Sequence, residues 1–489
     1  MKKNILVMLS LIFPSMFIFA QCPSLNFVLL RNQAEVDEFV SEYPDCTEIE
    51  SFLAIGVFAG SDESSDITDL SGLSSLTRIG SSLEINKTDS LITLEGLENI
   101  TYIGNDLEIL NNVNLRDISA LTNVDSIGRH LLIERNDSLE VIPDFNALNH
   151  LGSLLVISRN ENLKSIGTFN LLTNIGSSVK ISDSPLLNAL GGFNNLTSIE
   201  GGLTISDTGI RNFSAFNNLI EIREDDGFGG LFILRNPSLE NLSGLEKLQT
   251  ISPSLLIDNC ESLTTISALS SLTTIHENFR MFNTSIENVE SLGNVIIGNG
   301  FVRIRENGNL TSLGDLRLAS TINGDLDIHD NTFLEILPNF ENVDSVLGRF
   351  EVSDNVSLSN CLPICNLLLD GYIEGFTSIF GNLSGCETIE EITQNSCNTS
   401  STIEISTSNP IKISPNPIRN KLNIEVENGL TDEVEILIID HNGKTVYSNI
   451  RKLVNKVHNL EISEIHLSSG VYTILLNRGT IAISRFIKI

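Results

Sequence analysis

The sequence contains no tryptophan, and aromatic residues make up only 6% of its 489 residues. This scarcity favours a narrow, uniform interior with little room for bulky rings. Basic residues are also few, with 30 Lys and Arg against 62 Asp and Glu, so the net charge is −32. Repulsion from phosphates and anionic lipid headgroups argues against nucleic acid or a membrane surface as the main partner. A hydrophobic fraction of 41% excludes global disorder, and the length predicts several domains or an elongated array.

Long hydrophobic runs are confined to the start of the chain. Two lysines precede this apolar run and Ala20 closes it, which is the pattern of a signal peptide cleaved after Ala20. The run is short for a membrane span, and Gln21 is a poor residue to precede a lipidated Cys22. We therefore expect removal of residues 1–20. The mature chain, with a net charge of −34, is expected to be secreted or displayed at the cell surface.

The chain does contain one motif that is repeated mostly every 24 residues. Each copy begins with a triplet such as Leu83-Glu84-Ile85, whose alternation is typical of a short strand with two inward residues. Apolar residues then recur at every third position, which predicts turns or short helical segments. The copies are anchored at Ile55, Ile85, Ile109, Ile133, Ile157, Ile181, Ile205, Ile233, Ile257, Met281, Ile304, Ile328 and Val352. No copy can bury its own apolar residues, so we expect a repeat solenoid of about thirteen stacked coils with one main parallel sheet.

Three residue types recur in columns along the stacked copies. Asparagine three residues after the anchor is expected to form a buried ladder that satisfies backbone groups at a bend. Glycine closes each copy where the chain turns back, and we expect positive φ at Gly104, Gly128, Gly152 and Gly176. The asparagines are Asn112, Asn136, Asn160, Asn236, Asn307, Asn331 and Asn355, and a column of core phenylalanines comprises Phe145, Phe169, Phe193, Phe216 and Phe340.

The motif departs from an ordinary leucine-rich repeat, because leucine follows the anchor by six residues, as in Ile133 and Leu139. With phrases such as Leu70-Ser71-Gly72-Leu73 and Leu94-Glu95-Gly96-Leu97-Glu98-Asn99-Ile100, the repeat resembles the receptor L domain. That domain is the β-helical ligand-binding module of the insulin and epidermal growth factor receptors. The resemblance covers roughly residues 50–390. It implies a right-handed, β-helix-like array whose sheet face meets the ligand.

The cysteines lie mainly at the two ends of the solenoid, where exposed apolar surface needs a cap. In an exported chain such clusters indicate disulfides, and we expect Cys22 to pair with Cys46 within an N-terminal cap, residues 21–50. Four more cysteines close the solenoid, residues 51–397, and allow three connectivities, with a zinc site as the alternative. They are Cys361, Cys365, Cys386 and Cys397. Cys260 takes a ladder position and is expected to be a buried thiol.

The last part of the chain differs in composition. Residues 398–410 are rich in Ser, Thr and Asn, which predicts a linker. Residues 411–489 contain short alternating runs that predict a small β-sandwich. The expected strands are Leu422–Val426, Val434–Ile439, Gly470–Leu476 and Phe486–Ile489.

This C-terminal segment resembles the sorting domain of the bacterial type IX secretion system. The matching residues are Pro415-Asn416-Pro417, Gly443, Gly470-Val471-Tyr472 and the basic terminal strand. The resemblance implies recognition by the secretion machinery of a Gram-negative bacterium, followed by removal of the domain and attachment at the outer-membrane surface or release. An ordinary accessory sandwich is the alternative. The segment carries a charge of +2, which leaves −36 on the mature solenoid.

A candidate binding site lies in the two outward columns of the sheet, the residues just before and just after each anchor. The columns are acidic early, at Glu84, Glu108 and Glu134, and mixed late, at Asp327, His329 and Glu351. Between these lies a basic and aromatic patch: Phe232, Leu234, Leu256, Arg280, Phe282, Arg303 and Arg305. Arg and aromatic residues are enriched in binding hot spots, so we predict that this patch binds a glycan or protein ligand. The alternative is a solvated face, with Arg303 and Arg305 bridging Asp327 and Asp258.

The sequence offers few other candidates for a metal-binding or catalytic site. The acidic run Glu224-Asp225-Asp226 interrupts the period, and either a solvated loop or a Ca²⁺ site fits it. Common hydrolase, metalloprotease and P-loop motifs are missing, so we predict no catalytic residue, cofactor or metal. We expect a non-enzymatic, secreted or surface-displayed ligand-binding or adhesion protein. A polysaccharide-degrading lyase or hydrolase is the alternative, since Glu84 and Glu108 would lie on neighbouring strands about 5 Å apart.

Overall fold

The computed structural model describes residues 22–23, 27–57, 63–225, 228–314 and 316–397, together with residue 467 and the C-terminal strands given below. The chain divides into two compact units, Met1–Ile389 and Glu390–Ile489. Among the described residues, none of the helices has the length and apolar character needed to cross a bilayer.

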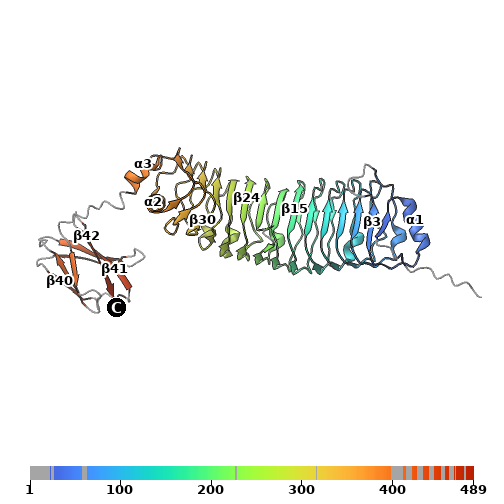
Figure 1. The fold of residues 1–489 in the computed structure, drawn as a ribbon, viewed down its shortest axis with the longest axis horizontal. Helices are drawn as coiled ribbons and strands as arrows, with labels where there is room; N and C mark the ends of the chain where they lie inside the picture. Colours follow the sequence, from blue (N-terminus) through green and yellow to red (C-terminus); the bar gives the residue numbers. More distant parts are fainter. Residues whose placement is uncertain are drawn as a thin grey trace, which may run out of the picture. The chain divides into compact units, whose positions relative to one another are not determined.

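One parallel sheet of fifteen strands runs along the first unit (Figure 1). Thirteen successive strands carry the thirteen predicted anchors, and β1 and β35 add one further strand at each end. The strands in order are β1 (Phe27–Leu30), β3 (Phe52–Gly56), β5 (Leu83–Asn86), β7 (Leu107–Leu110), β9 (Leu131–Glu134), β12 (Leu155–Ser158), β15 (Val179–Ser184), β18 (Leu203–Thr208), β22 (Leu231–Leu234), β24 (Leu255–Cys260), β26 (Phe279–Thr284), β28 (Val302–Arg305), β31 (Leu326–His329), β33 (Phe350–Ser353) and β35 (Thr377–Phe380).

Alternating burial explains why these segments form strands. In β7, Leu107 and Ile109 are fully buried, whereas Glu108 lies on the outer face. The backbone groups alternate in the same way, because the N–H of inward-facing Leu83 donates to the carbonyl of Asp106 on the following coil at 2.8 Å. Inward-facing residues therefore bond to the next coil, and outward-facing residues bond to the preceding one.

The chain bends just after the anchors, before the column that holds the asparagine ladder. In the coils from β5 to β33, the residue two positions after the anchor has a left-handed backbone, with φ between +50° and +58°. One position further, Nδ2 of Asn112 donates to the Ile85 carbonyl of the preceding coil at 2.9 Å, and its Oδ1 accepts from the Thr88 N–H at 3.0 Å. The predicted buried ladder is therefore confirmed. The left-handed residues are Lys87, Asn111, Arg135, Arg159, Asp183, Asp207, Arg235, Asn259, Asn283, Glu306, Asp330 and Asp354.

The expected positive φ at the four closing glycines is wrong, since the left-handed glycines of the described chain lie at other positions. Close packing requires these glycines instead. A Cβ atom on Gly128 would lie 1.9 Å from the carbonyl oxygen of Gly104 on the preceding coil. A Cβ atom on Gly104, Gly152 or Gly176 would likewise lie 2.0 to 2.1 Å from a carbonyl oxygen of the preceding coil. Any side chain here would force the coils apart.

Short 3₁₀ helices, which the spacing of three predicted, and two-residue strands, which it did not, form the other sides of the coils. Two parallel sheets contain β2 (Glu48–Ile49), β4 (Arg78–Ile79), β6 (Tyr102–Ile103), β8 (Ser126–Ile127) and β11 (His150–Leu151), and β14 (Asn174–Ile175), β17 (Ser198–Ile199), β19 (Glu221–Ile222), β23 (Thr250–Ile251), β25 (Thr274–Ile275), β27 (Ile296–Ile297) and β29 (Arg317–Leu318). Two more contain β10 (Val141–Ile142), β13 (Ser165–Ile166) and β16 (Ala189–Leu190), and β30 (Thr321–Ile322), β32 (Ser345–Val346) and β34 (Tyr372–Ile373). The 3₁₀ helices are η1 (Ser71–Leu73), η2 (Ser119–Asn123), η3 (Ser214–Phe216), η4 (Ser267–Ser271), η5 (Glu290–Leu292) and η6 (Leu362–Ile364).

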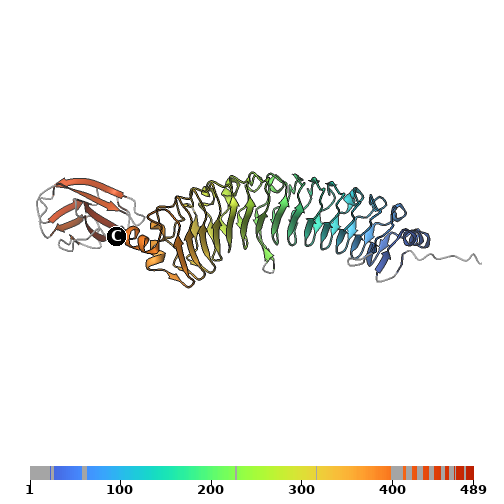
Figure 2. The ribbon, with the colours of Figure 1, turned by 90° about the horizontal axis from the view of Figure 1, so that it is seen from above.

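Figure 2 shows that the first unit is curved, with the main sheet along its concave side. A hairpin of β20 (Glu224–Asp225) and β21 (Phe228–Gly229) projects from that side (Figure 2). The interior is aliphatic, apart from phenylalanines. Four of the five predicted column residues stack ring on ring, with centroids 5.0 to 5.3 Å apart, whereas Phe340 packs edge-on against Phe350.

Disulfides secure both ends of the solenoid. The predicted bond between Cys22 and Cys46 is present beside helix α1 (Gln33–Glu42). At the other end Cys361 bonds Cys386, and Cys365 and Cys397 are also disulfide-bonded. The zinc alternative is therefore wrong, because these four cysteines have no free thiolate. The chain between Cys365 and Cys397 also contains α2 (Cys365–Leu369), α3 (Ile389–Glu391) and the π-helical turn η7 (Ile392–Ser396).

Cys260 is the free, buried cysteine that the sequence predicts. Its Sγ takes the place of an asparagine amide, 3.8 Å from the Ile233 carbonyl. Burial raises the pKa of this thiol to about 11. The group is therefore a packing residue of the ladder rather than a reactive nucleophile.

The C-terminal unit contains two antiparallel sheets among its described residues. One consists of β36 (Ile411–Ser414), β37 (Lys421–Val426) and β40 (Val457–Glu461), and the other of β39 (Thr445–Lys452), β38 (Glu433–Ile439), β41 (Gly470–Asn477) and β42 (Ile481–Lys488). Strands β37, β38, β41 and β42 contain the four strands expected from the sequence, except that Ile489 lies outside the described residues. The same is true of Gly443 and residues 415–417.

Candidate ligand-binding face

The seven predicted site residues lie together on the outer face of four consecutive strands, β22, β24, β26 and β28. In the column before the anchors, the register pairs Phe232 with Leu256, Leu256 with Arg280 and Arg280 with Arg303. In the column after the anchors, Leu234, Asp258, Phe282 and Arg305 are neighbours in turn. All seven side chains are partly exposed, so the face is accessible while its residues stay packed against one another.

Asp327 on β31 is the hub of the charged part of this face. Its carboxylate is fully buried and forms ion pairs with three arginines. Arg305 contacts Asp327 directly, Arg303 lies 3.7 Å away, and Arg349 binds at 2.7 Å from the following coil. A buried carboxylate needs such partners, because an isolated charge would be strongly destabilising there. The hydrogen bond to Asp327 raises the pKa of Arg349 above its ordinary value.

Two further carboxylates, Asp325 and Asp258, pair with arginines of this face. Arg303 Nη2 donates to Asp325 at 2.8 Å, and Arg280 lies 3.0 Å from Asp258. Burial opposes ionisation of Asp325, but hydrogen bonds from the Arg349 backbone and the Arg303 guanidinium bring its pKa below the ordinary value. Burial also raises the pKa of Asp258, and Arg280 offsets only part of this effect.

The face is therefore not a net basic patch. Four arginines (Arg280, Arg303, Arg305 and Arg349) are balanced by four carboxylates (Asp258, Asp325, Asp327 and Glu351). The alternative of cross-strand ion pairs is right for Asp327, which Arg303 and Arg305 contact. It is wrong for Asp258, because that carboxylate pairs with Arg280 on the adjacent strand and Arg305 lies two strands away.

Aromatic rings flank the arginines. The guanidinium carbons of Arg303 and Arg349 lie 4.4 Å and 5.7 Å from the ring centroids of Phe301 and Phe376, respectively. Arg280 lies 5.3 Å from Phe282 in the same way. These separations are within the range of cation–π contacts. Each ring adds apolar surface beside a fixed guanidinium, and Phe376 is 65% exposed.

Sequence reasoning missed Phe301, Arg349 and Phe376, together with Asp325. Phe301, Asp325 and Arg349 lie three residues before an anchor, in a third outward column that continues the alternation of the strand, and Phe376 takes the same position before Ile379 of the added strand β35. Extending the period of two by one step would have found them. We call Arg280, Phe282, Phe301, Arg303, Arg305, Asp327, Arg349 and Phe376 the Arg–Phe face.

The early coils carry a different, acidic group on the same sheet. Glu84 and Glu108 are register partners on β5 and β7, and Glu134 follows on β9. Burial, followed by repulsion from Glu84, Asp106 and Glu134, raises the pKa of Glu108 above its ordinary value. The sheet therefore has an acidic early part and the Arg–Phe face further along.

The acidic loop is only partly described. Glu224 and Asp225 form β20, whereas Asp226 lies outside the described residues, so the choice between a solvated loop and a Ca²⁺ site stays open. Beside the hairpin, Arg223 pairs with Glu200 at 2.8 Å and with Glu221 at 2.5 Å. Within the described part of the chain, no group of three or more His, Cys, Asp or Glu residues is arranged to hold a metal ion.

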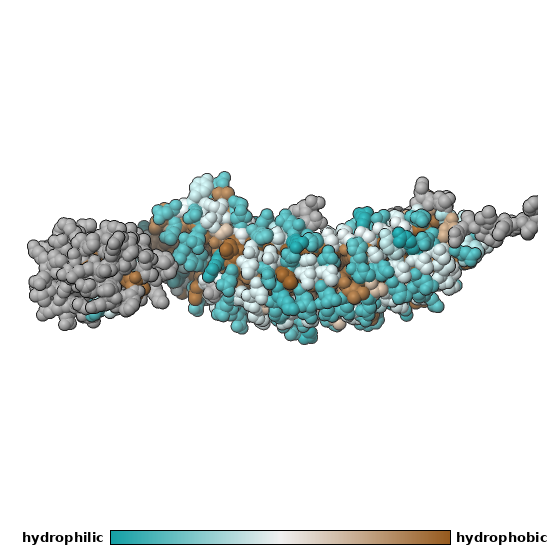
Figure 3. Space-filling model, turned by 90° about the horizontal axis from the view of Figure 1, so that it is seen from below, coloured by the Kyte–Doolittle hydropathy of each residue, from teal (hydrophilic) through white to brown (hydrophobic). Residues whose placement is uncertain are grey.

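One side of the solenoid has a mainly polar surface. Figure 3 shows one long side of the solenoid as largely hydrophilic, with small separate hydrophobic patches. Such scattered apolar residues are normal on soluble proteins and do not indicate a site.

The fold defines the first unit as a parallel β-solenoid with an extended, side-chain-rich sheet face. The family model for the Receptor L domain matches residues 152–264, and the family model for the Secretion system C-terminal sorting domain matches residues 412–489. Both resemblances predicted from the sequence are thereby confirmed, the first over residues 152–264 of the predicted span 50–390. The sorting domain indicates an exported protein that is secreted or held at the bacterial surface. A search of curated proteins finds no match to this chain.

Proposed function

We propose that the protein binds an extracellular glycan or protein ligand on its Arg–Phe face, without catalysing a reaction, as an adhesion or recognition protein. The carrying observation is the set of partly exposed arginines that the buried Asp327 holds beside aromatic rings. Side chains fixed in advance lose little conformational entropy on binding, and Arg and aromatic residues dominate hot spots.

The balance of charges narrows the ligand class. A simple polyanion would be attracted by unpaired arginines, but the arginines here already share buried carboxylates. A sugar ring or a mixed polar and apolar protein surface fits this face better. Both present polar groups that can bond to the planar guanidinium groups and apolar surface that can pack against the aromatic rings. The match to the receptor L domain covers residues 152–264, which precede the Arg–Phe face in the same solenoid, and supports binding on this sheet. The sorting domain supports display where such ligands occur.

The test combines retention with cleavage. The mature protein, residues 21–489, is incubated with an array of extracellular polysaccharides and glycans, and both bound protein and released fragments are measured. The proposal predicts retention of intact ligand. A triple variant, Arg280→Ala, Phe282→Ala and Arg305→Ala, should lose at least tenfold in affinity. The control triple, Arg116→Ala, Arg211→Ala and Phe333→Ala, removes exposed residues of the same types and should bind normally.

A second candidate is degradation of a polysaccharide at the acidic early coils. The supporting observation is the in-register pair of Glu84 and Glu108, in which the raised pKa of Glu108 suits a proton donor. Release of sugar fragments that Glu108→Gln abolishes would favour this candidate. Retention without fragments, lost only in the Arg–Phe variant, would favour binding.

A further inference from the structure

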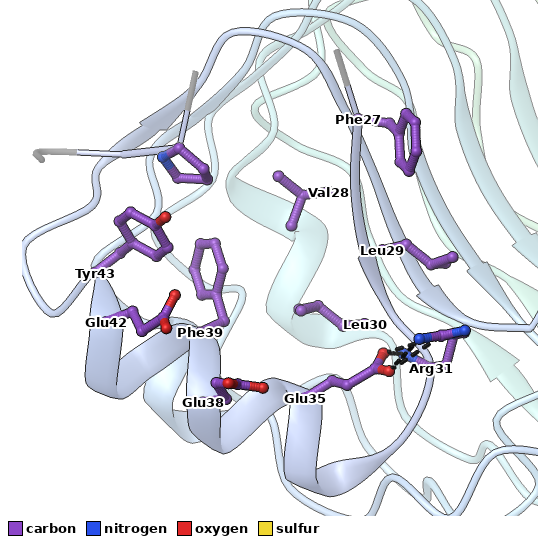
Figure 4. Close-up of a pocket in the computed structure, with 11 residues that line it drawn as sticks. Phe27, Val28, Leu29, Leu30, Arg31, Glu35, Glu38, Phe39, Glu42 and Tyr43 are labelled. Carbon is purple, nitrogen blue, oxygen red and sulfur yellow. Dashed lines mark hydrogen bonds and ion pairs between the residues drawn. The ribbon is translucent and has the colours of Figure 1, made fainter. Parts of the chain in front are cut away.

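The N-terminal end of the main sheet carries a second potential binding feature, which is independent of the Arg–Phe face. Strand β1 is the first strand of the sheet, and among the described strands it is paired only with β3. Helix α1 lies across this end, and a cavity of about 510 Å³ separates it from β1. Figure 4 shows the cavity with the strand on one side and the helix on the other.

Strand β1 has backbone hydrogen-bonding groups on its free edge, which follows from the alternation along the sheet. Val28 and Leu30 face inward and bond forward to β3, in line with the alternation along the sheet. The N–H and C=O of outward-facing Leu29 therefore point away from β3, toward the free edge. The next outward-facing residue confirms the direction, because the Arg31 N–H donates to Glu35 Oε2 of α1 at 2.7 Å. Leu29 has no such partner among the described residues.

The walls of the cavity have a distinct chemistry. Its floor is apolar, formed by Val28, Leu30 and Phe39, which are 3 to 7% exposed. The wall from α1 is acidic, because Glu35, Glu38 and Glu42 line the cavity, and Figure 4 shows Glu35 reaching toward Arg31. Arg31 neutralises Glu35 at 2.6 Å, whereas Glu38 and Glu42 form no ion pair within the described chain. Helix α1 contains no basic residue.

We propose that this opening binds an extended segment of another protein, which adds to β1 as a further strand. The free backbone groups of β1 would pair with the segment, as in other cases of strand addition. Because the floor is apolar and the wall is acidic, the segment should alternate apolar residues with Lys or Arg. A second copy of this chain fits poorly, since the solenoid is strongly acidic.

The probe is a fluorescent octapeptide of alternating Val and Lys, titrated into the mature protein and followed by anisotropy. A peptide of four Val followed by four Lys has the same composition and charge without the alternation, so it measures non-specific attraction to an acidic protein. We expect the alternating peptide to bind at least tenfold more tightly. Equal binding of the two peptides would overturn the proposal.

Two variants test the two proposed sources of affinity, which are the acidic wall of α1 and the free backbone groups of β1. Glu38→Gln with Glu42→Gln removes the unpaired carboxylates and should weaken alternating-peptide binding at least tenfold. The matched control, Glu48→Gln with Glu50→Gln, removes two exposed charges outside the cavity and should stay within twofold. Leu29→Pro removes the free N–H of β1 without breaking its pairing with β3, and should also weaken binding tenfold.

Retention of the Cys22–Cys46 bond and of the wild-type melting temperature shows that each variant is folded. If Leu29→Pro does not fold, the glutamine pair alone decides the outcome. Unchanged affinity in the glutamine pair would overturn the proposal. So would concentration-dependent dimerisation that Leu29→Pro abolishes, because it would identify a second copy as the occupant.

Discussion

Arg349 and Asp327 form a bidentate ion pair across two coils of the main sheet. Arg349 Nε donates to Asp327 Oδ1 at 3.0 Å, and Nη2 donates to Oδ2 at 2.7 Å. Paired, parallel bonds of this kind are among the strongest charge-assisted hydrogen bonds. Because the carboxylate is fully buried, the pair holds a guanidinium at the surface through a contact that lies beneath it.

Loss of the Asp327 charge should destabilise the solenoid. In Asp327→Asn, three arginines lose their shared counter-charge, and breaking a buried pair from one side costs about 3 kcal/mol. Urea unfolding would measure this change in the free energy of unfolding. The exposed Asp344 provides the control, since Asp344→Asn should change it by less than about 0.5 kcal/mol. Equal effects of the two variants would show that Asp327 is not the hub.

The close approach of coils at the glycine column gives a second prediction. Gly128→Ala places a methyl group against the Gly104 carbonyl and should destabilise the protein by about 2 to 3 kcal/mol or prevent folding. Gly308 has no atom within 4 Å of the corresponding position and no left-handed backbone, so Gly308→Ala should be neutral or slightly stabilising. Thermal melting compares the two. A well-folded Gly128→Ala variant would contradict the packing explanation.

The repeat determined much of the fold in advance, because each anchor must face the core and equivalent residues must stack. Ile109, for instance, could be placed in register with Ile85 and Ile133 from spacing alone. The glycine column shows the limit of that reasoning. In the sequence, a glycine required by close packing between coils looks the same as a glycine required by a positive φ. The site shows another limit. Arg303 and Arg305 were found, but their neutralisation by Asp327 depends on side-chain geometry that spacing does not give.

Cys260 should make the stability of the protein depend on pH in the alkaline range. Its pKa is raised from 9.0 to about 11 in the folded state, so the unfolded chain loses its proton first. The contribution of this group is therefore complete below pH 9 and is lost between about pH 9 and 11, by up to about 1.4 kcal/mol per pH unit. Cys260→Ser, which mimics Ser184 in the same column, should lack this slope. Parallel pH profiles of the two proteins would contradict the assignment.

Glu108 should make the stability of the protein depend on pH in the acidic range. Because its pKa is raised in the folded state, ionisation destabilises the native protein as pH rises through that pKa. Glu108→Gln should therefore raise the melting temperature at pH 7.5, and the gain should shrink toward pH 4. Glu95→Gln, at an exposed position, is the control and should give no such trend. A gain that is the same at both pH values would show that charge is not its cause.

The most direct test of the binding proposal is an affinity scan along the main sheet with the glycan or protein ligand retained by the mature protein. Single variants Phe301→Ala and Phe376→Ala probe the Arg–Phe face, and Val156→Ala and Thr204→Ala probe outward positions of earlier coils on the same sheet. The account predicts a loss of at least tenfold for the first pair and less than twofold for the second. A loss confined to the second pair, or spread evenly over all four, would contradict it.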